Sequence, residues 1–139
     1  MKISNNKKAA IVVIVSLVAI LPIAIAYRES SVIVDNKQIR ITGMYSERIP
    51  IEHLNQVFLA NTLPAITMRT NGIAIGSIRK GYFRSSSLER NVKLLLHSRN
   101  APFLYIIYGD NDKHVILNFR NSEKTLEVYE QIRGLVRNE

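Results

Sequence analysis

The feature that most constrains this chain is an apolar run close to its start. Residues 9–27 carry no charge, and Ser16 supplies their one aliphatic hydroxyl. As a helix this run rises roughly 28 Å, close to the ~30 Å thickness of a bilayer's hydrocarbon core. A helix at the surface of a soluble domain would show a polar face, and this run shows none. The sequence therefore predicts a basic tail over residues 1–8 and a transmembrane helix over residues 9–27.

Two interpretations of this helix stay open. It is either an uncleaved anchor or a secretory signal peptide, for which Ala24, Ile25 and Ala26 form a cleavage motif of the A-x-A type. The run is longer than the ~7–15 apolar residues of a typical signal core, which favours the anchor. The same length disfavours a third alternative, a buried helix of a soluble protein.

Basic residues flank the run on both sides. Those before it are Lys2, Lys7 and Lys8, and those after it, more widely spread, are Arg28, Lys37, Arg40 and Arg48. The positive-inside rule then places the N-terminus in the cytoplasm. We expect a single-pass protein of the cell membrane whose folded domain faces outside the cytoplasm. If the helix is cleaved, the domain is instead secreted or periplasmic.

Length and composition predict one folded domain after the span. The chain has 139 residues, of which 47% are hydrophobic, enough for a buried core in a single domain over residues 28–139. It has no cysteine, which excludes a disulfide scaffold, thiol catalysis and cysteine-ligated zinc.

The pattern in this domain is mostly that of short strands. Residues 31–34 and 38–42 are β-branched runs on either side of a hairpin turn at Asp35, Asn36 and Lys37. Residues 65–70 alternate as in a half-buried strand, and Asn71-Gly72 predicts a tight turn into a return strand over 73–78. Further strands are expected at 57–60, 92–96, 103–108 and 115–119, with a turn at 109–112.

The last segment changes to a helical period. Asn121 or Ser122 can cap a helix over about 122–137. Its predicted apolar face comprises Leu126, Tyr129, Ile132 and Val136, widened by Val128 and Leu135. The expected fold is mainly β within the α+β class: seven or eight antiparallel strands form a small barrel or orthogonal sandwich, and the C-terminal helix caps its open end.

Four stretches carry a resemblance to a known family. They are YSERIP at 45–50, LPAITMRTNG at 63–72, KGYF at 80–83 and PFLYI at 102–106. Together they resemble bacterial pleckstrin-homology (PH-like) domains, in the subgroup often attached to membrane spans. The resemblance covers roughly residues 30–137. It implies two near-orthogonal antiparallel sheets with a C-terminal helix over one end, and it brings no catalytic residues.

One glycine pair has the spacing of a phosphate-binding loop. Gly76 and Gly81 match its first part, but Tyr82 and Phe83 stand where a lysine and a Ser or Thr are required. Without the lysine there is no charge for the phosphates, so we expect no nucleotide or other cofactor.

Metal and catalytic patterns are also incomplete. His53, His97 and His114 are scattered, and residues 110–114 depart from a calcium loop after its first acidic positions. Ser85 in its serine run has no nucleophile elbow around it. We therefore expect no metal site, no catalytic residue and no enzyme.

A basic cluster is the feature with a chemical direction. Its members are Arg79, Lys80, Arg84, Arg90, Lys93 and Arg99, opposed by Glu89 alone, with Tyr82 and Phe83 interleaved. Near a membrane these cations can hold anionic lipid headgroups, and aromatic side chains suit the interfacial layer. The alternative is a solvated edge whose charges prevent aggregation between strands.

The net charge of +8 also permits a nucleic acid partner. A membrane span with an exported domain argues against one, and no helix-turn-helix is evident. The prediction is a membrane-tethered, non-catalytic binding or scaffolding module that mediates protein–protein contact or self-association. One alternative is anionic-lipid binding through residues 79–99. Another is a small exported ligand binder or enzyme that uses the barrel interior.

Overall fold

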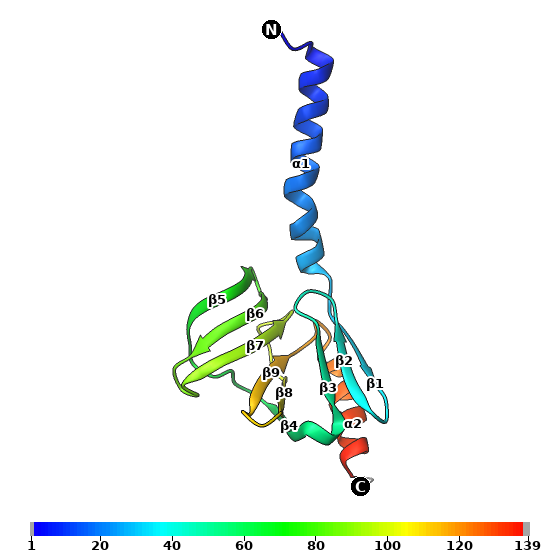
Figure 1. Ribbon diagram of the computed structural model, residues 1–139, viewed down its shortest axis with the longest axis vertical. Coiled ribbons are helices and arrows are strands. Elements are labelled where there is room, and N and C mark those ends of the chain that lie inside the picture. Colours follow the sequence, from blue (N-terminus) through cyan, green and yellow to red (C-terminus); the bar gives the residue numbers. More distant parts are fainter. Residues whose placement is uncertain (1, 138–139) are drawn as a thin grey trace.

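A computed structural model describes residues 2–137 of the chain (Figure 1). The helices are α1 (Asn5–Tyr27) and α2 (Ser122–Val136), with a short 3-10 helix η1 (Ile51–His53). The strands are β1 (Ser31–Val34), β2 (Gln38–Thr42), β3 (Glu47–Pro50), β4 (Leu54–Ala60), β5 (Ile66–Ile75), β6 (Ile78–Ser85), β7 (Arg90–Leu96), β8 (Phe103–Tyr108) and β9 (Lys113–Leu117). The structure is of the α+β class.

Helix α1 stands away from the rest of the molecule (Figure 1). It begins four residues earlier than expected, because the Ser4 hydroxyl caps the backbone N–H of Lys7 at 3.4 Å and polar residues fill the first turn. Its apolar side chains are exposed, except for Ala26 at the end that meets the folded domain. Its length and composition suit a membrane anchor or a signal sequence.

The strands form two sheets. The smaller sheet has the order β1-β2-β3, and the larger has the order β4-β8-β9-β7-β6-β5. All pairings are antiparallel except that of β7 with β9, which is parallel. Across residues 2–137 the nine strands exceed the expected seven or eight, the pairing is not wholly antiparallel, and there is no closed barrel. Two packed sheets with the C-terminal helix on them agree with the other part of the expectation. The large sheet does not close because β4 and β5 lie at its opposite edges.

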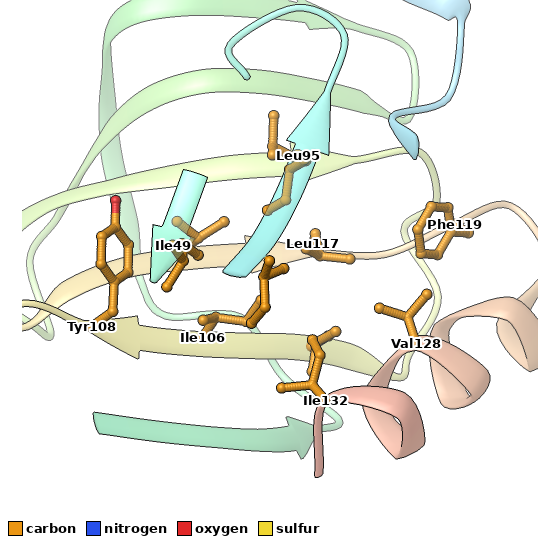
Figure 2. Close-up of a cluster of buried hydrophobic side chains, with 12 residues drawn as sticks. Ile49, Leu95, Ile106, Tyr108, Leu117, Phe119, Val128 and Ile132 are labelled. Carbon is orange, nitrogen blue, oxygen red and sulfur yellow. The ribbon is translucent and has the colours of Figure 1, made fainter. Parts of the chain in front are cut away.

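The main core lies between the two sheets and α2. Ile39, Ile41 and Ile49 of the small sheet meet the larger sheet, and Val128 and Ile132 cover it from α2 (Figure 2). Removing each such side chain from water stabilises the fold by about 1.5–3 kcal/mol. The interior is therefore filled by apolar packing.

The opposite face of the large sheet has its own apolar layer. Phe83, Leu94 and Phe103 lie in this layer, and the connection between β4 and β5 covers it with Leu63. Strand β8 is consequently buried at every position. This explains its unbroken apolar sequence, which is typical of strands covered on both faces.

The predicted turn at Asn71-Gly72 is wrong. Strand β5 continues through both residues, and the chain turns at Gly76, whose φ is +56°, and Ser77. Gly72 pairs with Gly81, and the two backbones approach so closely that a Cβ on Gly72 would overlap the carbonyl oxygen of Lys80. Gly72 therefore serves a close approach between strands.

Strand β5 is also exposed, where the alternation predicted a half-buried strand. Met68 is 59% exposed and Ile66 is 37% exposed. The strand lies at the sheet edge, beyond the reach of the small sheet and α2 (Figure 1).

Helix α2 begins as expected, since the side chain of Asn121 accepts a hydrogen bond from the N–H of Glu123 at 2.9 Å. The predicted face is partly wrong, because Leu126 and Val136 are exposed. Thr125 is buried instead, and its hydroxyl accepts the N–H of Phe119 at 3.1 Å. This bond belongs to the buried face of the helix, which comprises Thr125, Val128 and Ile132.

Candidate functional site

The six residues of the predicted basic cluster do not form one patch. Arg79, Lys80 and Arg99 have their hydrogen-bond partners at the end of the large sheet that meets α1. The others point elsewhere. Arg84 is exposed near the end of β6, and Arg90 donates to the carbonyls of residues 111 and 112. Lys93 turns toward β3. Of the six, the structure joins Arg79 and Arg99, which share an acceptor.

Lys80 lies at the junction between α1 and the domain. Its side chain is buried, and its Nζ donates to the carbonyl oxygen of Arg28, in the link between α1 and β1. Burial, and then the positive charge of Arg120, lowers the pKa of Lys80. The guanidinium of Arg120 donates to the carbonyl of Tyr27, the last residue of α1. Two cations from the domain thus hold two consecutive carbonyls, that of Tyr27 at the end of α1 and that of Arg28 in the link.

Glu29 completes the junction. Its carboxylate accepts the backbone N–H of Arg120 at 2.8 Å and lies 3.5 Å from the Nζ of Lys124. Burial alone would raise the pKa of Glu29, but these two contacts lower it overall. The junction therefore pairs an anion of the link with cations of the domain, so α1 ends directly on folded structure.

His97 lies buried beside this junction. Burial, and then the charge of Lys80, lowers the pKa of His97 to about 4. Within the described chain neither ring nitrogen has a hydrogen-bond partner. The neutral imidazole is therefore the form that the folded protein holds near neutral pH.

Glu29 and Arg120 were not singled out from the sequence. They are 91 positions apart, so no local pattern joins them. The sequence offers one signal of this junction, which is that the apolar run and the first strand lie close together along the chain.

A hollow of about 290 Å³ lies at the other end of the same sheet face. It is lined by Glu47, Tyr82, Asn91, Lys93, Tyr108, Lys113, His114 and Val115. Lys93 pairs with the Glu47 carboxylate, and its Nζ also lies 3.3 Å from the carbonyl of Ser46 and 5.1 Å from the centre of the Tyr82 ring. Burial, and then a hydrogen bond with Glu47, raises the pKa of Tyr108. Lys93 and Glu47 neutralise each other, so this buried ion pair is tied up in joining β7 to β3.

The remaining chemical candidates stay dispersed. Among residues 2–137, no three His, Asp or Glu side chains come together to hold a metal. The hydroxyl of Ser85 accepts the N–H of Leu88 at 3.2 Å and so ties the turn after β6. This is a structural contact in a turn.

The edge strand β5 offers backbone groups. Among the described strands, β6 is its one neighbour, so its outer edge carries unpaired N–H and C=O groups. Register shifts interrupt the pairing with β6 between Ile66 and Met68 and again between Arg69 and Asn71. Such bulges are typical of sheet edges.

No family model, no curated protein and no solved structure matches this chain. The function is therefore inferred from the geometry above.

Proposed function

We propose that this chain is a membrane-anchored, non-catalytic binding module that self-associates through the outer edge of β5. The observation that carries the proposal is β5 itself, ten residues long, exposed along most of its length and open at the sheet edge. Sheet edges bind by strand addition, in which backbone hydrogen bonds supply affinity and side chains supply specificity.

The junction supports an anchor over a cleaved signal. Ala26, the last residue of the A-x-A motif, is 1% exposed because it lies against the folded domain. The carbonyls of Tyr27 and Arg28 are held by Arg120 and Lys80. Such contacts suit a helix that remains part of the mature protein.

A second copy of the chain is the proposed partner. Each copy offers the same open edge, and pairing would cover the exposed side chains of Ile66 and Met68. Anchoring both copies in one bilayer raises their effective concentration, so that modest affinity suffices.

The resemblance to membrane-attached PH-like domains belongs to this proposal. The C-terminal helix on a sheet agrees with it, whereas the parallel pairing of β7 with β9 departs from the antiparallel sheets it implies. The apolar filling between the sheets disfavours a ligand site or active site in the interior (Figure 2).

Cysteine crosslinking tests the self-association, because the chain has no native cysteine. Met68→Cys and Ala74→Cys each place a thiol on exposed positions of β5, and Asn36→Cys places one in the β1–β2 turn as a matched control. In native membranes a bis-maleimide should give dimers with the β5 variants and not with Asn36→Cys. Equal crosslinking at all three positions, or none on β5, would contradict the proposal. A crosslinked product between a β5 variant and a larger protein would show that the partner is that protein and not a second copy of the chain.

The side of the membrane has its own test. Asn111→Cys lies in the exposed turn between β8 and β9. If the domain faces outward, a membrane-impermeant maleimide should label this cysteine in spheroplasts before lysis. Labelling only after lysis would place the domain in the cytoplasm.

A further inference from the structure

Two arginines converge on one carbonyl beside the end of α1. Arg79 donates from Nη1 to the carbonyl oxygen of Gly76 at 2.7 Å and to that of Ile78 at 2.9 Å. Arg99 donates from Nη2 to the same Gly76 oxygen at 3.1 Å. A third arginine, Arg28, directly follows α1 and is exposed. These three residues, Arg28, Arg79 and Arg99, are called the arginine collar below.

The position of Tyr27 sets the depth of the collar. A Cβ built on Gly76 would lie 4.0 Å from the Tyr27 hydroxyl oxygen, so the β5–β6 turn lies beside the last residue of α1 (Figure 1). Tyrosine is enriched where a span leaves the hydrocarbon and enters the headgroup layer. When the apolar part of α1 occupies the bilayer core, Arg79 and Arg99 therefore lie at the level of the lipid phosphates.

A hollow of about 470 Å³ adjoins Arg28 at the same depth. Its lining runs from Ile25 in the span to Thr42 at the end of β2 and Met44 in the β2–β3 connection, and it includes Glu29. Glu29 is already paired with Arg120 and Lys124. The hollow thus places one apolar residue of the span, Ile25, next to Arg28, which directly follows the span, and this matches the order of acyl chain and phosphate in a lipid.

The collar is not neutralised within the protein. Across residues 2–137, none of its three guanidinium groups has a carboxylate within 4.0 Å, whereas Lys93, Arg120 and Lys124 each have one. A guanidinium has five N–H donors in a planar fork, and that fork matches two oxygens of a phosphate. The N–H donors beyond those used on the carbonyls of Gly76 and Ile78 can turn to a phosphate.

We infer that the arginine collar binds the phosphates of anionic phospholipids in the bilayer that α1 spans. This inference rests on the proposed anchoring of α1. It divides the basic segment 79–99, since Arg79 and Arg99 contact lipid while Arg84, Arg90 and Lys93 do not. The bound headgroups fix how the domain lies against the bilayer.

Spin-labelled lipids test the inference on the full chain. The protein is reconstituted in phosphatidylcholine vesicles, and the preference of spin-labelled phosphatidylglycerol over spin-labelled phosphatidylcholine for the protein-bound lipid shell is measured by electron spin resonance. The collar variant is Arg28→Gln, Arg79→Gln and Arg99→Gln together. The matched control removes the same charge from exposed positions distant from α1, with Arg69→Gln, Arg84→Gln and Lys113→Gln.

We expect the wild-type chain to prefer the anionic lipid several-fold, each cation contributing up to about fivefold. The collar variant should lose this preference, and the control should keep it. Arg99→Gln alone, at an exposed loop position, should lower it partially while leaving the circular dichroism spectrum unchanged. Equal preference in the wild type and the collar variant, or equal loss in the control, would overturn the inference.

Retention after an alkaline carbonate wash separates this inference from the anchor. If the chain stays in the vesicles but shows no lipid preference, lipid binding by the collar is refuted and the proposed anchor is retained. If the chain is washed off, the proposed anchor is refuted, and lipid binding by the collar with it.

Discussion

Two buried lysines on the same face of the large sheet have opposite surroundings. Lys80 on β6 pairs in register with Leu95, and Lys93 on β7 pairs with Tyr82, so the two lie near each other on one face. Lys80 points toward α1 and holds a carbonyl of the link. Lys93 points toward β3 and holds the carboxylate of Glu47.

The difference shows that burial alone does not tell what a basic residue does. At the junction the buried cation meets a carbonyl dipole, and the pKa of Lys80 is lowered because burial outweighs the attraction of Glu29. At the hollow the buried cation meets a full negative charge. The first arrangement attaches α1, and the second joins the small sheet to the large one.

The largest expected effect is that of removing the cation at the hollow. Lys93→Ala leaves the Glu47 carboxylate, whose side chain is 20% exposed, without its partner. We expect a loss of about 3 kcal/mol in the free energy of unfolding, because an unpaired charge then stays largely buried. Urea unfolding of the full chain in detergent, followed by circular dichroism, measures it. The double variant Lys93→Met, Glu47→Met should recover most of the loss, and a cost below about 1 kcal/mol for Lys93→Ala would contradict the pairing.

The next effect concerns acid sensitivity at the junction. The pKa of His97 is lowered to about 4 in the folded state, from the usual 6.5. As pH falls from 6.5 to 4, the unfolded chain therefore takes up the proton first, and stability falls over this window by up to about 3 kcal/mol before levelling off. The lowered pKa of Glu29 adds a further loss as pH falls below its ordinary value of 4.5.

Melting temperatures at pH 7.0, 5.5 and 4.5 measure this effect. His97→Gln should flatten the change between pH 7.0 and 4.5, and His53→Gln, at an exposed position, should not. A wild-type slope that survives in His97→Gln would assign the acid sensitivity to other groups.

A smaller effect is expected for the junction lysine. Lys80→Met keeps the length of the side chain but leaves the Arg28 carbonyl without its donor, at a cost of about 1 kcal/mol. It should also loosen the link, so that trypsin cleaves after Arg28 in vesicles faster than in the wild type. If Lys80→Met proves as costly as Lys93→Ala, the contrast between the two lysines is wrong.

The smallest effect comes from the ring above Lys93. Tyr82 places its ring centre 5.1 Å from the Lys93 Nζ and packs edge-on against Tyr45 at 6.2 Å. Tyr82→Leu should cost about 0.5–1 kcal/mol. A double-mutant cycle with Lys93→Met measures the part that depends on the cation, and a coupling of zero would leave only the aromatic packing.

Local signals explain which elements could be predicted from the sequence. The first hairpin formed as expected, because the Asp35 carboxylate accepts the N–H groups of Lys37 and Gln38 at 2.8 and 2.9 Å. The apolar run of α1 and the Asn121 cap of α2 are local in the same sense. Gly72 misled the prediction, because a glycine required for a close approach between strands looks like a glycine required for a turn.

Non-local pairing explains the rest. The parallel pairing of β7 with β9 depends on β8 lying on the far side of β9, and no residue in β7 or β9 indicates this arrangement. The sequence shows that the basic residues of the cluster lie close together along the chain. In the fold, their side chains alternate along β6 and β7 and contact different partners, so they do not form one patch. The contact of Glu29 with Arg120 joins the two ends of the domain, so it follows from the completed fold.

The strand order also has a consequence for how the protein is made. Strands β5, β6 and β7 are sequential neighbours and can pair as soon as they leave the ribosome or translocon, while β4 must wait for β8 and β7 must wait for β9. Until Leu117 has emerged, the edge of β7 that pairs with β9 stays open, because β9 follows β7 and β8 along the chain. Synthesis therefore includes an interval in which a half-built sheet is exposed to aggregation, and a chaperone that shields extended apolar strands would act in that interval.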